Sequence, residues 1–119
     1  MKIIVFGGRD FTNRSWMLSC LVELQTEGII TPDVELLCGR ARGADNTAYD
    51  LFKEAGANIH EFPADWEFYG KRAGFVRNKE MAALADVGLG FWDGKSKGTK
   101  HMIEEMKRLN KPLYVVHYD

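Results

Sequence analysis

The sequence lacks a long apolar run and an excess of either charge. No apolar stretch approaches the roughly 20 residues that a membrane helix requires, so we expect no membrane span. Sixteen basic and seventeen acidic residues leave a net charge of −1, which provides no global positive field to attract a polyanion. This balance argues against both a membrane and nucleic acid as partners.

Cysteine is also scarce, and histidine shows no useful spacing. The two cysteines, Cys20 and Cys38, fall in different predicted elements without C-x-x-C spacing, which favours free thiols. The three histidines, His60, His101 and His117, lack metal-ligand spacing. We therefore predict no metal site and no bound cofactor.

What is present is typical of one soluble globule. A length of 119 residues suits a single domain over 1–119, and 45% hydrophobic with 28% charged residues is ordinary for such a domain. The apolar N-terminus, Met1–Gly8, is too short for a signal peptide and has no cleavage site. The expected location is the cytoplasm.

Strand-like and helix-like segments alternate along the whole chain. Apolar runs predict strands over 2–6, 34–38, 58–62, 86–91 and 113–116. Helical spacing predicts helices over about 13–27, 44–55, 72–85 and 99–109, and an aromatic loop is expected over 63–70. This βαβα order predicts an α/β fold, a single Rossmann-like three-layer sandwich with a parallel sheet of about five strands.

Four turns directly follow strands, at 7–10, 39–45, 65–70 and 92–99. Ligands of such sheets bind outside the carboxyl ends of the strands, so these turns should share the ligand edge. In the last turn, Gly94 and Gly98 allow backbone amides to converge on a phosphate, and Thr99 can cap the next helix. The spacing is not that of a Walker A loop, and a plain strand-to-helix connection, or a solvated loop tip at Lys95, Ser96 and Lys97, would use similar residues.

Arg77 is the most informative single residue. It shares an i, i+4, i+7 helix face with Met81 and Leu84, and arginine is rarely buried without a partner. Either an anionic ligand or a buried carboxylate, such as Asp86 or Asp10, should receive its guanidinium.

Other candidates also have two interpretations. Gly7-Gly8-Arg9 can bind phosphate or simply form a tight turn. Asp45 can accept ribose hydroxyls or serve as a first-turn acid favoured by the helix dipole. Trp66, Phe68 and Tyr69 can stack on a base or pack over the core.

The blocks GGRDF (7–11), GRARGAD (39–45), PADW (63–66), AGFVRNKEM (73–81) and FWDGKSKGT (91–99) resemble the YspA-like branch of the SLOG superfamily, in order and spacing. The resemblance implies a Rossmann-like module for nucleotides, NAD-derived molecules such as ADP-ribose, or, in the DprA branch, single-stranded DNA. Related SLOG proteins often pair through their helices, so a homo-oligomer is open.

A weaker resemblance links the chain to LONELY GUY (LOG) phosphoribohydrolases, whose patterns are R-K-x-E-M and P-G-G-x-G-T-x-E-E. Arg77, Met81 and Gly98-Thr99 match parts of these patterns, but His101 stands where the catalytic acid is expected. Glu104 and Glu105 lie a turn further along the helix. Asp10, Asp45 or Asp93 would have to supply the carboxylate instead.

We expect the chain to bind a nucleotide or NAD-derived phosphorylated ligand as a sensor or sequestering module. The alternatives are a LOG-like hydrolase and a DprA-like single-stranded DNA binder. No catalytic residue is assigned, and whether any bond is cleaved stays open. The predicted ligand-binding residues are Gly7, Gly8, Arg9, Asp10, Gly39, Arg40, Gly43, Asp45, Trp66, Arg77, Asn78, Trp92, Asp93, Gly94, Ser96, Lys97, Gly98 and Thr99.

Overall fold

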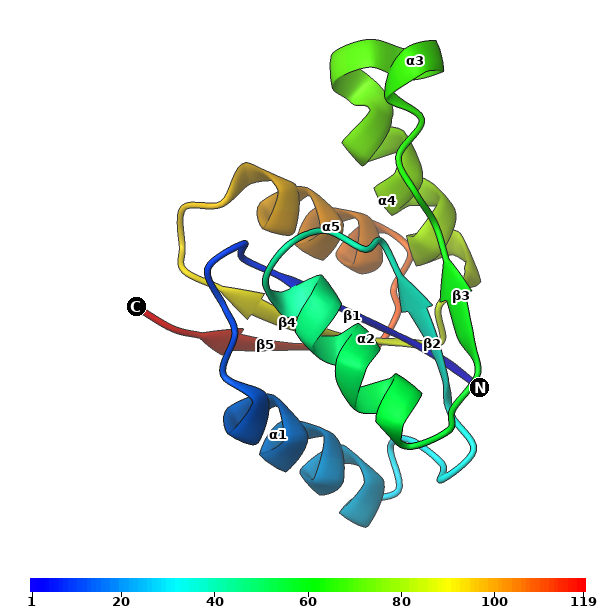
Figure 1. Cartoon of the computed structure of the whole chain (residues 1–119), viewed down its shortest axis with the longest axis vertical. Coiled ribbons are helices and arrows are strands. Elements are labelled where there is room, and N and C mark those ends of the chain that lie inside the picture. The colour runs from blue at the N-terminus through cyan, green and yellow to red at the C-terminus, as the bar shows by residue number, and fades with distance from the viewer.

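In a computed structural model that describes all residues 1–119, one five-stranded sheet is covered by helices on both faces (Figure 1). The predicted strands and helices are present, with ends within about two residues of the expected ones. The elements in chain order are β1 (Lys2–Gly7), α1 (Arg14–Thr26), β2 (Glu35–Cys38), α2 (Ala44–Glu54), β3 (Ile59–Glu61), α3 (Trp66–Tyr69), the 3₁₀ turn η1 (Gly70–Arg72), α4 (Ala73–Leu84), β4 (Val87–Trp92), α5 (Lys97–Arg108) and β5 (Leu113–His117).

The strand order is β3-β2-β1-β4-β5, and every neighbouring pair is parallel. The chain winds outward from β1 to β3, then crosses back to place β4 on the other side of β1. The reversal of strand order therefore lies between β1 and β4. The α/β prediction with five parallel strands is confirmed.

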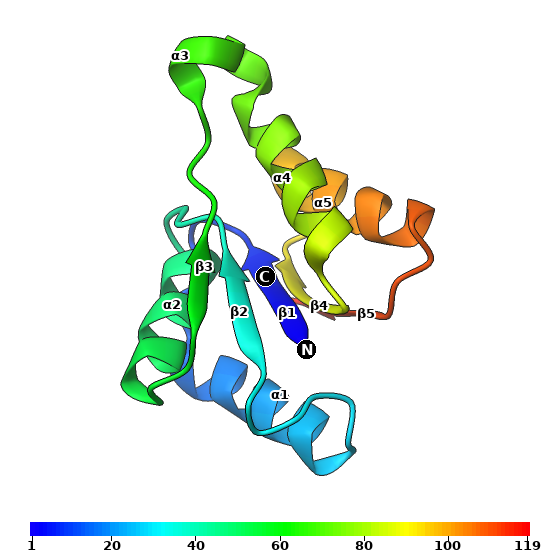
Figure 2. The same cartoon turned by 90° about the vertical axis from the view of Figure 1, so that its right-hand side faces the viewer.

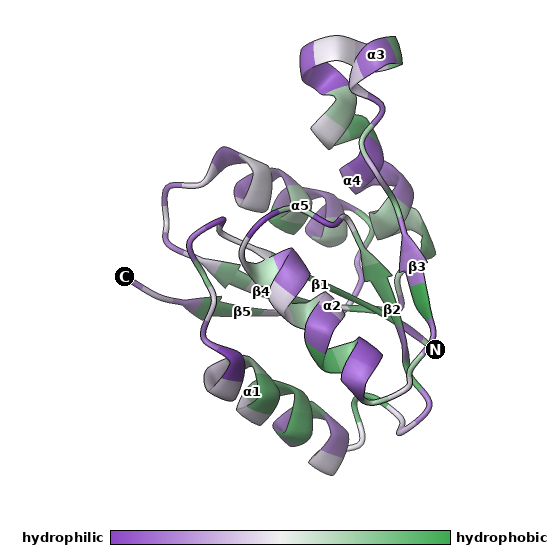
Figure 3. Cartoon of the chain, in the orientation of Figure 1, coloured by the Kyte–Doolittle hydropathy of each residue, from purple (hydrophilic) through white to green (hydrophobic).

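Two apolar cores lie on the two faces of this sheet (Figures 2 and 3). Side chains of β1 alternate between them: Ile3 and Val5 join the core under α1 and α2, whereas Ile4 and Phe6 join the core under α4 and α5. The continuous apolar run of β1 follows from this two-sided burial. No helix is long and apolar enough to cross a bilayer.

Glycines in β4 make room for the second core. In the β1–β4 register Phe6 lies opposite Gly90, and a Cβ added at Gly90 would come within 2.6 Å of the Phe6 ring. The outer edge of the Phe6 ring therefore packs over Gly90, near the carboxyl end of β4. This packing fixes an apolar floor at the ligand edge.

Two predictions about the α4 region differ from the structure. The stretch predicted as a loop contains a short helix, α3, because the Asp65 carboxylate accepts the Phe68 amide at 3.1 Å and caps a single turn. On α4, Met81 is buried as predicted, but Leu84 is 51% exposed. Ala82 and Ala85 take the inward positions there and join the core that contains Met102 and Met106 of α5.

Candidate functional site

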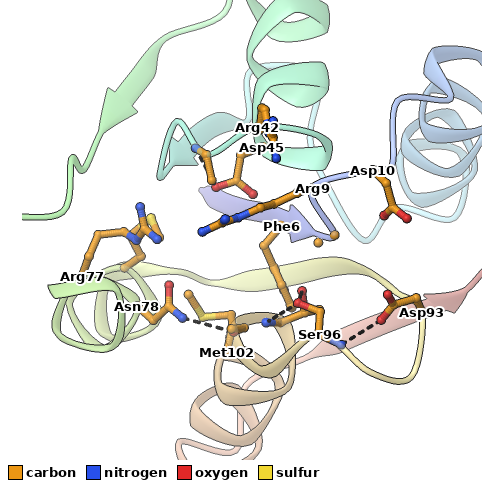
Figure 4. A pocket seen from close by; sticks show the side chains of 16 residues that line it. Phe6, Arg9, Asp10, Arg42, Asp45, Arg77, Asn78, Asp93, Ser96 and Met102 are labelled. Atoms are coloured by element: carbon orange, nitrogen blue, oxygen red, sulfur yellow. Dashed lines mark hydrogen bonds between the residues drawn. The ribbon is translucent and has the colours of Figure 1, made fainter. Parts of the chain in front are cut away.

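A cleft of about 460 Å³ opens at the carboxyl ends of β1 and β4, where the strand order reverses (Figure 4). This volume lies within the roughly 300–1,000 Å³ typical of ligand pockets, and the place is the one expected for an open α/β sheet. Its walls come from the turns after β1, β2 and β4 and from helices α4 and α5. It is lined by Phe6, Gly7, Gly8, Arg9, Asp10, Ala41, Arg42, Asp45, Arg77, Asn78, Met81, Asp93, Ser96, Gly98, Thr99 and Met102.

Asp45 is the buried acid of the cleft. Its residue is only 6% exposed, and its Oδ2 accepts the Ala41 amide at 3.4 Å. Burial raises the pKa of Asp45 to about 6, although the Arg77 charge and amide donors from Ala41 and Gly7 oppose that rise. A carboxylate kept in such an unfavourable place is typical of a functional site.

Arg77, on α4, lines the same cleft as Asp45. Its Nη1 donates to the Gly39 carbonyl at 2.8 Å, while its buried Nε has no hydrogen-bond partner in the protein. Arg77 forms no ion pair: Asp10 accepts the Tyr118 hydroxyl at 2.6 Å, and Asp86 accepts the Lys2 amide at 2.7 Å. The predicted alternative of a pair with Asp10 or Asp86 is therefore absent, and the guanidinium keeps donors available for an anion.

The turn before α5 is ordered by its own side chains. One oxygen of Asp93 accepts the amides of Lys95 and Ser96, each at 2.8 Å, and these bonds lower the Asp93 pKa. Ser96 is the N-cap, and its hydroxyl lies 3.0 Å from that of Thr99. The first-turn amides of α5, at Lys97 and Gly98, have no acceptor inside the helix, so they can face an anion.

Two further arginines line the cleft without protein partners. Neither Arg9 nor Arg42 makes a side-chain hydrogen bond or an ion pair, and Figure 4 shows Arg9 extending into the cleft between the elements that carry Asp45 and Arg77. On the opposite wall, Asn78 donates to the Gly98 carbonyl at 3.3 Å and thereby ties α4 to the start of α5. The cleft thus presents free cations beside helix-terminal amides.

Most predicted site residues come together here, and several do not. Outside the lining, Gly39 supplies the carbonyl that Arg77 binds, and Gly43 packs against the backbone of Gly8 and Arg9. Arg40 lies with its guanidinium 3.6 Å from the Tyr49 ring centroid. The remaining predicted residues outside the lining are Trp66, Trp92, Gly94 and Lys97.

Sequence reasoning omitted five lining residues. Phe6, Met81 and Met102 are inward-facing apolar residues at the ends of their elements, and helical or strand periodicity could have placed them near the ligand edge. Ala41 and Arg42 belong to the predicted turn after β2, but their direction depends on Arg40, whose φ is +59°. The sequence contains no signal for that backbone conformation at an arginine.

No carboxylate lies where the LOG resemblance would require one. His101 packs against the Phe75 ring at 4.4 Å between centroids and does not line the cleft. Glu105 is buried and binds Arg108 at 2.7 Å. The acids that do face the cleft are Asp10, Asp45 and Asp93.

A cleft at the reversal of a parallel sheet, bounded by glycine-rich turns, defines a Rossmann-like α/β protein, and solved structures share this fold. DNA processing protein A (DprA) of Streptococcus pneumoniae superposes with a TM-score of 0.71 and 15% identity, over 99% of this chain and 50% of that one. DprA of Helicobacter pylori superposes with a TM-score of 0.67 and 21% identity, over all of this chain and 66% of that one. The chain therefore spans half to two thirds of these proteins.

The sequence matches no established protein-family model. It is, however, 34% identical over 121 residues to the Gene 61 protein of Mycobacterium phage D29, covering 94% of this chain and 93% of that protein. The chain belongs to the family of that phage protein.

The prediction that nucleic acid is an unlikely partner is contradicted. The H. pylori relative in fold is a protein described by its single-stranded DNA binding mode, so this fold does serve nucleic acid. Net charge misled because it sums over the whole surface, whereas Arg9, Arg42 and Arg77 gather at one cleft.

Proposed function

We propose that the cleft binds the phosphate group of a nucleotide unit. The observation that carries this proposal is the convergence of Arg9 and Arg77 with the N-terminus of α5 at the reversal of the sheet. Guanidinium groups and helix-terminal amides are the usual protein donors to phosphate. Cleavage of the ligand is not part of the proposal, because His101 replaces the carboxylate that the LOG pattern would use.

A single strand of nucleic acid is the first candidate source of that phosphate. Support comes from the fold, because 99% or more of this chain superposes on part of each DprA structure. Arg42 lines the same cleft as Arg9 and is exposed, so it can contact the next phosphate of a strand.

A free nucleotide, such as a nucleoside monophosphate or ADP-ribose, is the second candidate. Asp45 favours it, because a buried acceptor beside a phosphate site suits the hydroxyls of a ribose. The five sequence blocks that resemble the YspA-like branch point the same way, and residues 1–119 would then act as one binding domain.

Two titrations on the same protein separate the candidates. Fluorescence anisotropy with a labelled oligodeoxythymidylate at low salt tests the strand, and isothermal titration with AMP and ADP-ribose tests the free nucleotide. The folded protein, freed of carried-over ligand, should bind at least one of these probes, and heat or anisotropy changes from none of them would contradict the proposal.

Two arginines from one turn provide a matched comparison. Arg42→Ala removes a cation that lines the cleft, whereas Arg40→Ala removes one that lies on Tyr49 outside it. We expect Arg42→Ala to lower the affinity for the single strand by about tenfold, and Arg40→Ala to leave that affinity unchanged. Equal effects of the two changes would show that overall charge, rather than the cleft, determines binding.

A further inference from the structure

The segment between β3 and α4 forms an arm that stands away from the body of the protein, beyond the carboxyl ends of the strands (Figures 1 and 2). We call residues 63–72 the aromatic arm. Trp66 is 58% exposed and Phe68 is 78% exposed, and neither belongs to the two apolar cores. Exposed aromatic residues on an ordered element commonly mark a binding surface.

The arm adjoins the cleft through Gly74, at the start of α4. A Cβ added at Gly74 would lie 3.8 Å from the ring edge of Trp66 and 3.8 Å from Nη2 of Arg77. The indole and the guanidinium therefore flank the same glycine and lie within the span of one nucleotide unit. Because Gly74 has no side chain, the surface between them is open to a chain that leaves the cleft.

The positive charges of the arm lie at the end that leads into α4. The cations Lys71 and Arg72 lie in η1, on the side that leads into α4, and neither is in an ion pair. Of the two acids, Asp65 is engaged as the helix cap and Glu67 is exposed in the first turn of α3. Aromatic faces beside cations are the usual construction of surfaces that bind single strands by stacking.

We propose that the aromatic arm stacks a base of a single-stranded nucleic acid whose neighbouring phosphate lies in the cleft, with Trp66 as the principal platform and Phe68 as a second. This inference rests on the proposed function, and specifically on its first candidate. The arm would then contribute to the affinity for a single strand but not to the affinity for a mononucleotide. A second copy of this chain is the competing occupant of the same aromatic surface.

The test compares Trp66→Ala, Trp66→Phe and Phe68→Ala with the wild-type protein. The probes are an oligodeoxythymidylate of about 12 nucleotides, within the usual site sizes for single strands, and thymidine 5′-monophosphate. Trp66→Ala should lower the affinity for the oligonucleotide by about five- to a hundredfold, and Trp66→Phe should retain most of the wild-type affinity. Affinity for the mononucleotide should not change in any of the three.

Tyr114→Ala is the control, since Tyr114 is an aromatic residue with 38% exposure on β5, away from the arm. Oligonucleotide affinity unchanged in both Trp66→Ala and Phe68→Ala would overturn the inference, and so would an equal loss in Tyr114→Ala. Binding of the mononucleotide without the oligonucleotide would overturn the arm's role while leaving the cleft's intact. Sedimentation that shows a wild-type dimer converted to monomer by Phe68→Ala, with strand affinity retained, would assign the arm to self-association instead.

Discussion

Asp45 should make the free protein less stable as the pH rises, and replacing it with asparagine should remove that loss. Its pKa in the folded protein is about 6, against an ordinary value of 3.8. Each pKa unit corresponds to roughly 1.36 kcal/mol, so the buried carboxylate costs about 3 kcal/mol of unfolding free energy when ionised. Asp45→Asn keeps the shape and an acceptor for the Ala41 amide, but cannot ionise.

The sign follows from which state binds the proton. Below about pH 4, Asp45 is protonated in both the folded and unfolded chains and contributes no penalty. Between about pH 4 and pH 6 the unfolded chain ionises first, so the stability of the wild type falls relative to the variant. Above about pH 6 both states are ionised and the difference stays constant.

Urea unfolding of both proteins, at steps of about half a pH unit from pH 4 to pH 7.5, measures this difference directly. Other titrating groups occur in both proteins and cancel. The free energy of Asp45→Asn minus that of the wild type should rise by about 3 kcal/mol across the interval. A difference that stays flat over this range would show that Asp45 ionises normally, and would remove the main argument for its functional burial.

Four further substitutions test the packing and the cleft. Arg77→Ala should lower the unfolding free energy by ~1.5–3 kcal/mol, because it loses the hydrogen bond of a charged group to Gly39 and a positive charge that favours the ionised form of Asp45. The same change should weaken the binding of phosphate ligands by about ten- to a hundredfold, and a loss of stability with ligand affinity intact would exclude Arg77 from the site. Ser96→Ala should cost ~1 kcal/mol in a thermal melt, because the N-cap of α5 is lost, and an unchanged melt would show that Asp93 alone orders the turn. Gly90→Ala should lower the unfolding free energy, measured in urea, by ~1–3 kcal/mol, because the added methyl group contacts the Phe6 ring. Gly98→Ala has open space around its Cβ and should not lower that free energy. Similar losses of stability in the two variants would refute the packing argument.

The fold was predictable because the apolar runs and helical stripes alternate with little ambiguity. The ligand edge followed from the same pattern, since parallel strands place all their following turns together. The sequence pattern therefore placed Arg77, Asp45 and the turn before α5 at one edge of the sheet, where they line one cleft. Their convergence required only that the sheet be parallel.

The remaining features depend on geometry that a linear pattern does not contain. Arg40 and Arg42 are two residues apart in one turn, yet a positive φ at Arg40 directs its guanidinium to Tyr49 and leaves Arg42 in the cleft. The direction of the aromatic arm is set by one turn of helix capped by Asp65, which propensity over four residues cannot predict. Leu84 was misplaced because the helix ends there, so its last turn is not obliged to follow the buried face.

The central position of β1 determines when the cleft can exist during folding. β1 pairs with β4 through contacts as distant in sequence as Ile3 and Val87, and the ligand edge joins residues from both ends of that separation. Closing so long a loop is slow compared with local helix formation. A chain emerging from the ribosome would complete β1, β2 and β3 with Phe6 still uncovered on one face, because Gly90 and α5 are not yet made. We therefore expect ligand binding during synthesis to require β4 and α5, and the apolar face of β1 to stay exposed until they form.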